Sequence, residues 1–210
     1  MASLQAHGDG LWTLHYPLRF FGMALGRRVS VLQVAPGQVV VHSTGPFRET
    51  DTAAIRGLGE VVAMADVTNL HDTFAVPGRR AFPEPPYYVP ARFPAPARDT
   101  GTVELRPGQT PGGPALQWVP LAGMRWIDEW ACFHPSSRTL LVADLIFHLP
   151  EARGYTRWAM RHLAGVRTWP AIDRPVRFAI RDRAAFAANM ETLLALDFDR
   201  LVMAHGEVIE

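Results

Sequence analysis

The sequence feature that most constrains the fold is a long stretch dense in proline and glycine that separates two strand-rich halves. Residues 82–114 read "FPEPPYYVPARFPAPARDTGTVELRPGQTPGGP". Because proline lacks a backbone N–H and fixes φ, this stretch cannot supply a long helix or a central strand. It predicts a surface excursion with one edge strand near residues 87–89, serving as a lid or a substrate wall. A domain linker is the alternative, but each flanking half looks incomplete alone, so we expect one domain over 1–210.

Length and charge narrow the class of protein further. The chain has 210 residues, enough for one well-packed domain and short for two. Its net charge is +1 and its basic residues, all arginine, are scattered, which indicates neither a nucleic-acid nor a membrane partner. The pairs at 27–28 and 79–80 are typical of solvated turns. Cys132 is the single cysteine, which fits a reducing cytoplasm, and no leader-like or membrane-spanning stretch is visible.

Short apolar runs alternate with turns in both halves of the chain. Residues 28–34 alternate in hydrophobicity, "PGQ" then makes a turn, and residues 39–43 are the natural hairpin partner. A helix over 52–59 and a buried strand over 60–67 follow, so 39–67 resembles a β-α-β unit. The second half predicts three strands, helices capped by Thr156 and Asp182, and a closing strand that runs into "HG".

Three polar residues lie at or near the ends of these apolar runs: His71, Asp144 and His205. In α/β sheets, ligands usually bind at the carboxyl ends of strands. A carboxylate inside an apolar strand must be paired, hydrogen-bonded or bound to a metal to offset its desolvation. Imidazole and carboxylate together suit zinc, iron or manganese. Each residue alone is more often structural, as a core histidine or as an aspartate paired with arginine.

The order of the segments resembles the metallo-β-lactamase fold superfamily. The resemblance runs from "VSVLQV" and "GQVVVHSTGPF" through "AMADVTNLHDTFA" and "RTLLVADLIF" to "LVMAHG", and so covers most of the chain. The most specific match is "HPSSRTLLVADLIF", which is similar to the pattern H-x-S-R-T-L-x-x-x-D-L-x-F of an uncharacterised branch, with one extra residue. The resemblance implies an α/β fold, an αββα sandwich of two mixed sheets flanked by helices, with a metal site at one edge.

The resemblance also implies that the ligand set is reduced. Asp144 matches the aspartate that can bridge two metal ions, His205 matches the C-terminal histidine, and His71 matches the second histidine of H-x-H-x-D-H. The positions that depart from the family pattern, including the one where an aspartate usually orients the attacking water, are His42, Asn69, Thr73, Phe74 and Met124. Two metal ions need more ligands than remain.

We therefore expect at most one ion, zinc or else iron or manganese, held by His71, Asp144 and His205. The protein would be a hydrolase of an unknown small molecule, with Asp72 or His42 as the base, and a homodimer is left open. His134 and His148 are spare groups.

Two alternatives stand beside this hypothesis. A non-catalytic member of the fold would hold no metal, with Asp144 paired to His205 or to an arginine and with Asn69, Met124 and Phe74 filling the former metal space. A redox or sensing role through non-haem iron is the weaker alternative, because two histidines and one carboxylate also make a facial triad.

Overall fold

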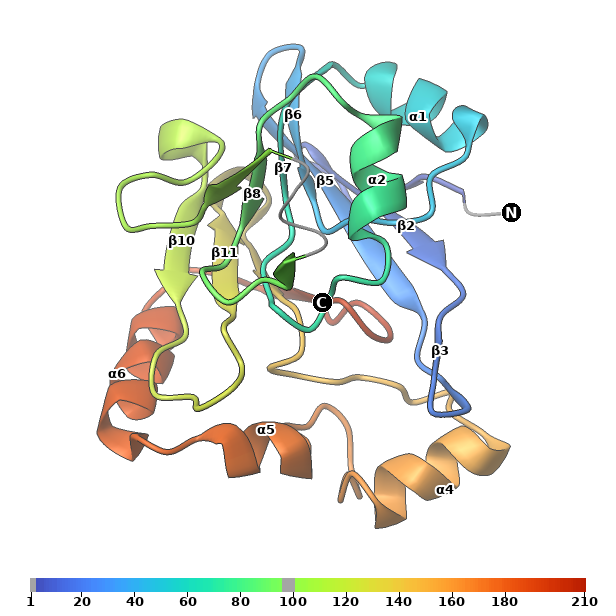
Figure 1. Cartoon of the computed structure of the whole chain (residues 1–210), viewed down its shortest axis with the longest axis vertical. Helices are drawn as coiled ribbons and strands as arrows, with labels where there is room; N and C mark the ends of the chain where they lie inside the picture. The colour runs from blue at the N-terminus through green and yellow to red at the C-terminus, as the bar shows by residue number, and fades with distance from the viewer. Residues whose placement is uncertain (1–2, 96–100) are drawn as a thin grey trace.

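The strands form two mixed sheets that lie between helices (Figure 1). The structure is a computed structural model that describes residues 3–95 and 101–210. The first sheet has the order β1 (Gln5–Ala6), β2 (Leu11–Tyr16), β5 (Arg27–Ala35), β6 (Gln38–His42), β7 (Glu60–Ala65), β8 (Tyr87–Val89), β9 (Thr102–Glu104). The second has the order β10 (Gln117–Pro120), β11 (Trp130–His134), β12 (Thr139–Val142), β13 (Arg200–Met203). A separate hairpin joins β3 (Arg19–Phe20) to β4 (Met23–Ala24).

Helices cover the outer face of each sheet. The first sheet carries α1 (Glu49–Arg56) and α2 (Ala75–Ala81), and the second carries α5 (Arg174–Ala179) and α6 (Arg183–Leu194). The remaining helix, α4 (Gly154–His162), packs beside β4, and η1 (Gly113–Ala115) and η2 (Pro135–Ser137) are single turns. The predicted αββα fold class is confirmed. Within the described part of the chain, no helix is both long and apolar enough to cross a membrane.

Alternation along β6 shows how one strand supplies two cores. Val39 and Val41 point to the outer core, where Ile55 of α1 packs against the first sheet. Val40 points the other way and packs with Leu141 of β12 in the core between the sheets. A strand with apolar residues on both faces is buried on both sides, which is the arrangement that a central strand of an αββα sandwich requires.

The proline-rich excursion contributes more to the sheet than the sequence suggested. The edge strand expected near 87–89 is wrong in its position, because β8 lies between β7 and β9 and pairs in parallel with both. Residues 87–89 and 102–104 contain no proline, so their N–H groups are free to pair. Tyr87 and Val89 are fully buried, and β9 is the sheet's edge.

The predicted helix starts differ in their outcome. Asp182 caps α6 as predicted, because its side chain accepts a hydrogen bond of 3.0 Å from the backbone N–H of Ala185. Thr156 is not a cap, because α4 begins two residues earlier at Gly154. Its hydroxyl instead accepts a 2.9 Å hydrogen bond from the backbone N–H of Ala24. A tertiary contact thus uses the group that local sequence reasoning assigned to the helix end.

Candidate metal centre

His71, Asp144 and His205 meet where three strands end. Asp144 and His205 each lie two residues beyond a directly paired position of the parallel strands β12 and β13, where Val142 faces Met203. They therefore share one register and one edge of the second sheet. His71 follows β7 of the first sheet, and all three side chains are buried. The two sheets thus bring one histidine and a His–Asp pair to a common point.

The distances between these side chains match the ligand shell of a single ion. His71 Nε2 lies 3.2 Å from His205 Nε2 and 3.2 Å from Asp144 Oδ2, and His205 Nε2 lies 3.3 Å from Asp144 Oδ1. Tetrahedral ligands with bonds of about 2.0–2.1 Å lie about 3.3 Å from one another. Asp144 Oδ2 is buried and has no hydrogen-bond partner among the described residues. The donor set therefore fits one metal ion and leaves a coordination position open.

The protonation states also suit metal ligation. Burial and then the Arg27 cation lower the pKa of His71 to about 4, although Asp144 opposes this. Burial favours the protonated form of Asp144, but the two imidazoles, His71 first, outweigh it and hold the pKa of Asp144 below its ordinary value. At neutral pH the cluster therefore holds an ionised carboxylate beside a neutral His71. A metal ion needs an ionised carboxylate and neutral imidazoles, and it also needs an imidazole nitrogen that faces it without a proton.

His205 has the hydrogen-bond partner that is usual for a metal-ligating histidine. Its Nδ1 donates a 2.6 Å hydrogen bond to the backbone carbonyl of Gly26. This bond fixes the proton on Nδ1 and leaves the lone pair of Nε2 directed at Asp144 and His71. The ring of Phe147 stacks on the imidazole, with centroids 5.6 Å apart, and holds its plane.

His71 has the opposite kind of partner. Its Nδ1 is hydrogen-bonded to the Arg27 guanidinium. A guanidinium can only donate, so Nδ1 must accept, and a neutral ring then carries its proton on Nε2. That proton faces Asp144 and His205. His71 therefore binds a metal ion through Nε2 only after the proton leaves or the ring reorients.

The Arg27 side chain belongs to a buried ion pair with Asp66. Arg27 Nη2 donates to Asp66 Oδ1 over 2.9 Å, and Nε donates to the carbonyl of Thr44 over 3.1 Å. Asp66 also accepts from the backbone N–H of Thr44 (2.9 Å), the Thr44 hydroxyl (2.6 Å) and the Tyr87 hydroxyl (2.5 Å). Both charges are thus compensated inside the protein, as burial demands.

The expectation that residues 27–28 form a solvated turn is therefore wrong. Arg27 and Arg28 are the first two residues of β5, and both are buried. Arg28 donates to the Thr13 hydroxyl over 3.2 Å and to the carbonyl of Gly206 over 2.6 Å. Their partners come from distant parts of the chain, so the local sequence gives no sign of them.

Glu129 holds the backbone that carries Asp144. Its carboxylate accepts hydrogen bonds of 2.8, 3.1 and 3.2 Å from the backbone N–H groups of Ala143, Asp144 and Leu145. Burial and the neighbouring Asp144 charge raise the pKa of Glu129 to about 8, although the three N–H groups oppose this. Glu129 thus fixes the turn after β12 and the position of the Asp144 side chain.

The two candidate bases lie in different surroundings. His42 ends β6, is buried, and stacks on Trp118 with centroids 6.0 Å apart. Its Nε2 has no hydrogen-bond partner among the described residues, and burial, then Arg27, lowers its pKa to about 4. Asp72 is exposed on the turn before α2. Their role as bases stays a prediction.

Several other histidine and motif positions have structural partners. The His134 ring lies between the Ser137 hydroxyl (2.7 Å) and the carbonyl of Gln33 (3.0 Å). The amide of Asn69 donates to the Trp126 carbonyl (2.9 Å) and accepts from the Asp128 N–H (2.8 Å), which joins two loops.

Met124 packs in the core of the second sheet. His148 lies outside the group of candidate ligands.

Sequence reasoning missed Arg27, Asp66 and Glu129. Asp66 had a usable signal, because it closes the apolar run "VVAMAD" as Asp144 closes "TLLVAD". The desolvation argument that singled out Asp144 applies equally to Asp66, which also needs partners once it is buried. The sequence around Arg27 and Glu129 gives no such signal.

Comparison with known proteins identifies the fold. No protein-family model matches the chain, and no curated protein sequence matches it. Among solved structures, a metallo-β-lactamase from Pontibacter korlensis matches with a TM-score of 0.67 and 14% identity, covering 100% of this chain and 94% of that one. The FIM-1 metallo-β-lactamase from Pseudomonas aeruginosa in its mono-zinc form matches with a TM-score of 0.62 and 13% identity, covering 99% and 89%. An Erythrobacter litoralis metallo-β-lactamase matches with a TM-score of 0.61 and 10% identity, covering 99% and 86%.

Proposed function

Because the chain has the metallo-β-lactamase fold, we propose that it is a metal-dependent hydrolase with a single ion held by His71, Asp144 and His205. The observation that carries this proposal is that the two imidazole Nε2 atoms lie 3.2 Å apart and each lies 3.2–3.3 Å from one oxygen of Asp144, with one ligand atom from each residue within 4.8 Å of the others. Three protein ligands and an open position are typical of catalytic zinc, and we infer zinc ahead of iron or manganese. A bound ion would supply Lewis-acid chemistry, polarising an ester, amide or phosphoester and lowering the pKa of water.

The chain's own residues divide the remaining work. Asp144 offers the negative charge, and both of its oxygens face the histidines. Glu129 positions Asp144 through the backbone, and the Gly26 carbonyl orients His205. His42 is the buried neighbour with an unpartnered ring nitrogen, so it could accept a hydrogen bond from a reacting group.

A non-catalytic role is the second candidate, and the Arg27 contact with His71 favours it. Arg27 places a fixed positive charge beside the cluster, where a divalent cation would be repelled. Arg27 is hydrogen-bonded to His71, and His71 Nε2 lies 3.2 Å from Asp144 Oδ2, so the three side chains already contact one another without a metal ion. In this reading the cluster supports the fold, and the protein acts as a binding or scaffold protein.

Elemental analysis separates the two candidates. We would purify the wild type, His71→Ala, Asp144→Ala and the exposed control Asp72→Ala without added metal or chelator. The hydrolase proposal expects one ion per chain in the wild type and in Asp72→Ala, and almost none in the other two. Equal, near-zero metal in all four proteins would contradict it and support the non-catalytic role.

A charge-neutral double variant tests whether Arg27 suppresses binding. Arg27→Met with Asp66→Asn removes the cation together with its partner and keeps the shape of residue 66. If Arg27 competes with the ion, zinc affinity rises in this variant. Zinc-loaded wild type is then assayed on a chromogenic ester, a β-lactam and a phosphodiester. Any turnover assigned to this site must disappear in Asp144→Ala.

A further inference from the structure

The net charge of the chain hides an uneven distribution. Residues 151–183 contain eight arginines and three acidic residues, a net charge of +5, whereas the whole chain carries +1. All eight arginines are exposed. Of the acidic residues, Asp173 and Asp182 cap helices through backbone hydrogen bonds, and Glu151 pairs with Arg153. The segment that contains α4 and α5 is therefore strongly basic, and the rest of the chain balances it.

The same region exposes large apolar side chains. They come from the β3–β4 hairpin, from α4 and the residue after it, and from α5: Phe20, Phe21, Tyr155, Trp158, Leu163 and Phe178. Phe21, in the turn of the hairpin, is 79% exposed, and Phe178 is 76% exposed. A single exposed apolar residue needs no explanation, but a group of this size beside a basic segment marks an interaction surface. We call these six side chains, with the arginines of 151–183, the basic aromatic face.

The face is continuous across the three elements. The hairpin and α4 are joined by the Ala24–Thr156 hydrogen bond, and Gly22 lies against the ring of Tyr155. On α4 the rings of Tyr155 and Trp158 stack 5.9 Å apart. Leu163 and Phe178 then line one shallow groove that joins α4 to α5. In Figure 1 these elements lie together along the lower edge of the molecule.

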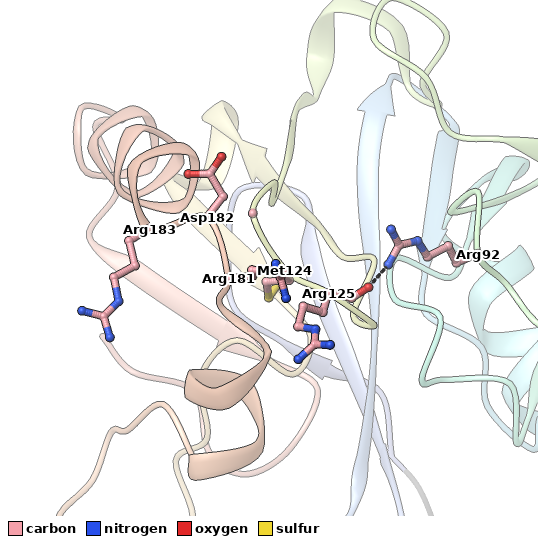
Figure 2. A pocket seen from close by; sticks show the side chains of 7 residues that line it. Arg92, Met124, Arg125, Arg181, Asp182 and Arg183 are labelled. Atoms are coloured by element: carbon pink, nitrogen blue, oxygen red, sulfur yellow. Dashed lines mark hydrogen bonds between the residues drawn. The ribbon is translucent and has the colours of Figure 1, made fainter.

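A basic cavity extends this face beside α5 and α6. Figure 2 shows Arg183 on one side and Arg92 on the other side of a cavity of about 650 Å³, with Arg125 and Arg181 between them. Among the described residues, Arg125, Arg181 and Arg183 form no ion pair with a carboxylate. Trp126 links Arg125 of this cavity to the aromatic group, because its ring lies 5.7 Å from the Arg125 guanidinium and 6.0 Å from the ring of Phe178.

We propose that the basic aromatic face docks the protein onto an anionic phospholipid surface. Tryptophan, tyrosine and phenylalanine favour the headgroup boundary, where a hairpin turn with two phenylalanines can insert. Exposed arginines are attracted to lipid phosphates and to anionic headgroups. A second copy of this chain is a poor occupant, since an isologous contact would set one basic segment against another. The proposal departs from the expectation based on net charge, and it does not depend on the metal centre.

Co-sedimentation with vesicles tests the proposal. One vesicle type is phosphatidylcholine alone, and the other is phosphatidylcholine with phosphatidylserine at about 2:1. We expect the wild type to bind the second type, and to be released when salt rises from about 0.1 M to about 0.5 M. F20S/F21S and R157E/R161E should each lower the partition coefficient at least about tenfold. All four positions are exposed, so we expect these variants to fold, which far-ultraviolet circular dichroism checks.

Matched controls come from outside the face. Leu194 is 75% exposed on α6, and Arg80 is exposed on α2. Leu194→Ser and Arg80→Glu should bind vesicles as the wild type does. The proposal is overturned if the wild-type protein stays in the supernatant with both vesicle types. It is also overturned if the control variants lose as much vesicle binding as F20S/F21S and R157E/R161E. If short double-stranded DNA competes fully and F20S/F21S still binds that DNA normally, the face is a nucleic-acid surface instead.

Discussion

Two buried aspartates end strands in the two sheets, and their surroundings differ completely. Asp66 follows β7 and receives hydrogen bonds from the Arg27 guanidinium, from Thr44 through two groups, and from the Tyr87 hydroxyl. Asp144 follows β12, faces two imidazoles, and has one buried oxygen without a hydrogen-bond partner among the described residues. The first is a saturated structural anion. The second has acceptor capacity left for a ligand.

The difference shows that the burial of a carboxylate does not by itself indicate a ligand-binding site. Both carboxylates are almost inaccessible, at 0% for Asp66 and 7% for Asp144. What separates them is whether the folded chain already supplies every donor that an ionised carboxylate can accept. The same test separates His205, whose Nε2 is free to ligate, from His71, whose Nδ1 accepts from Arg27.

The largest effect should come from Asp66→Asn. This change leaves the buried Arg27 cation without its counter-charge, so we expect the free energy of unfolding to fall by about 3–5 kcal/mol. Urea unfolding of chelator-treated protein measures it, with the exposed Asp72→Asn as control, which should change stability by less than about 0.5 kcal/mol. A loss below about 1 kcal/mol would show that Asp66 is not the structural anion described above.

Asp144→Asn should matter most when metal is present. Without metal we expect a modest loss of unfolding free energy, because the amide gives up the interactions with two imidazoles that hold the pKa of Asp144 below its ordinary value. With zinc at 100 times its Kd, the wild type should gain about 2.7 kcal/mol of unfolding free energy and the variant almost none. Urea unfolding with and without zinc provides the comparison. Equal zinc stabilisation in both proteins would exclude Asp144 as a ligand.

His42 should make the protein sensitive to acid. Its folded-state pKa of about 4 lies below its ordinary value of 6.5, so the unfolded chain binds the extra proton between these values. The contribution of His42 to the free energy of unfolding is therefore fully present above pH 6.5 and is lost as the pH falls towards 4. Between pH 7 and pH 5 this one group should remove about 2 kcal/mol, a loss that His42→Gln avoids. Unfolding of both proteins at the two pH values tests this, and identical pH dependence would contradict it.

The smallest effect should come from Tyr87→Phe. This variant removes one of the donors to Asp66 and leaves the ion pair with Arg27 in place. We expect a loss of about 1 kcal/mol and no change in metal content. Chemical unfolding and elemental analysis of the same sample measure both. A change in metal content would mean that the two aspartates are coupled and that the contrast between them is incomplete.

Local sequence patterns anticipated much of the fold and part of the site. Alternation predicted the β5–β6 hairpin, and strand ends drew attention to His71, Asp144 and His205, which lie together in the structure. The same patterns could not reveal Arg27, because its contacts with Asp66 and His71 span 39 and 44 residues of sequence. The place of β8 inside the sheet was equally invisible, since an order of strands is a tertiary property.

The shared register of Asp144 and His205 links the site to the pairing of β12 with β13. Successive side chains of a strand point to opposite faces, so a slip of one residue would turn His205 away from Asp144. An ion that binds both residues would then stabilise only the correctly paired strands, and it would stabilise them only when His71 has arrived from the other half of the chain. A bound metal ion would thus favour the correct strand register, and the correct assembly of the two halves, over mispaired states.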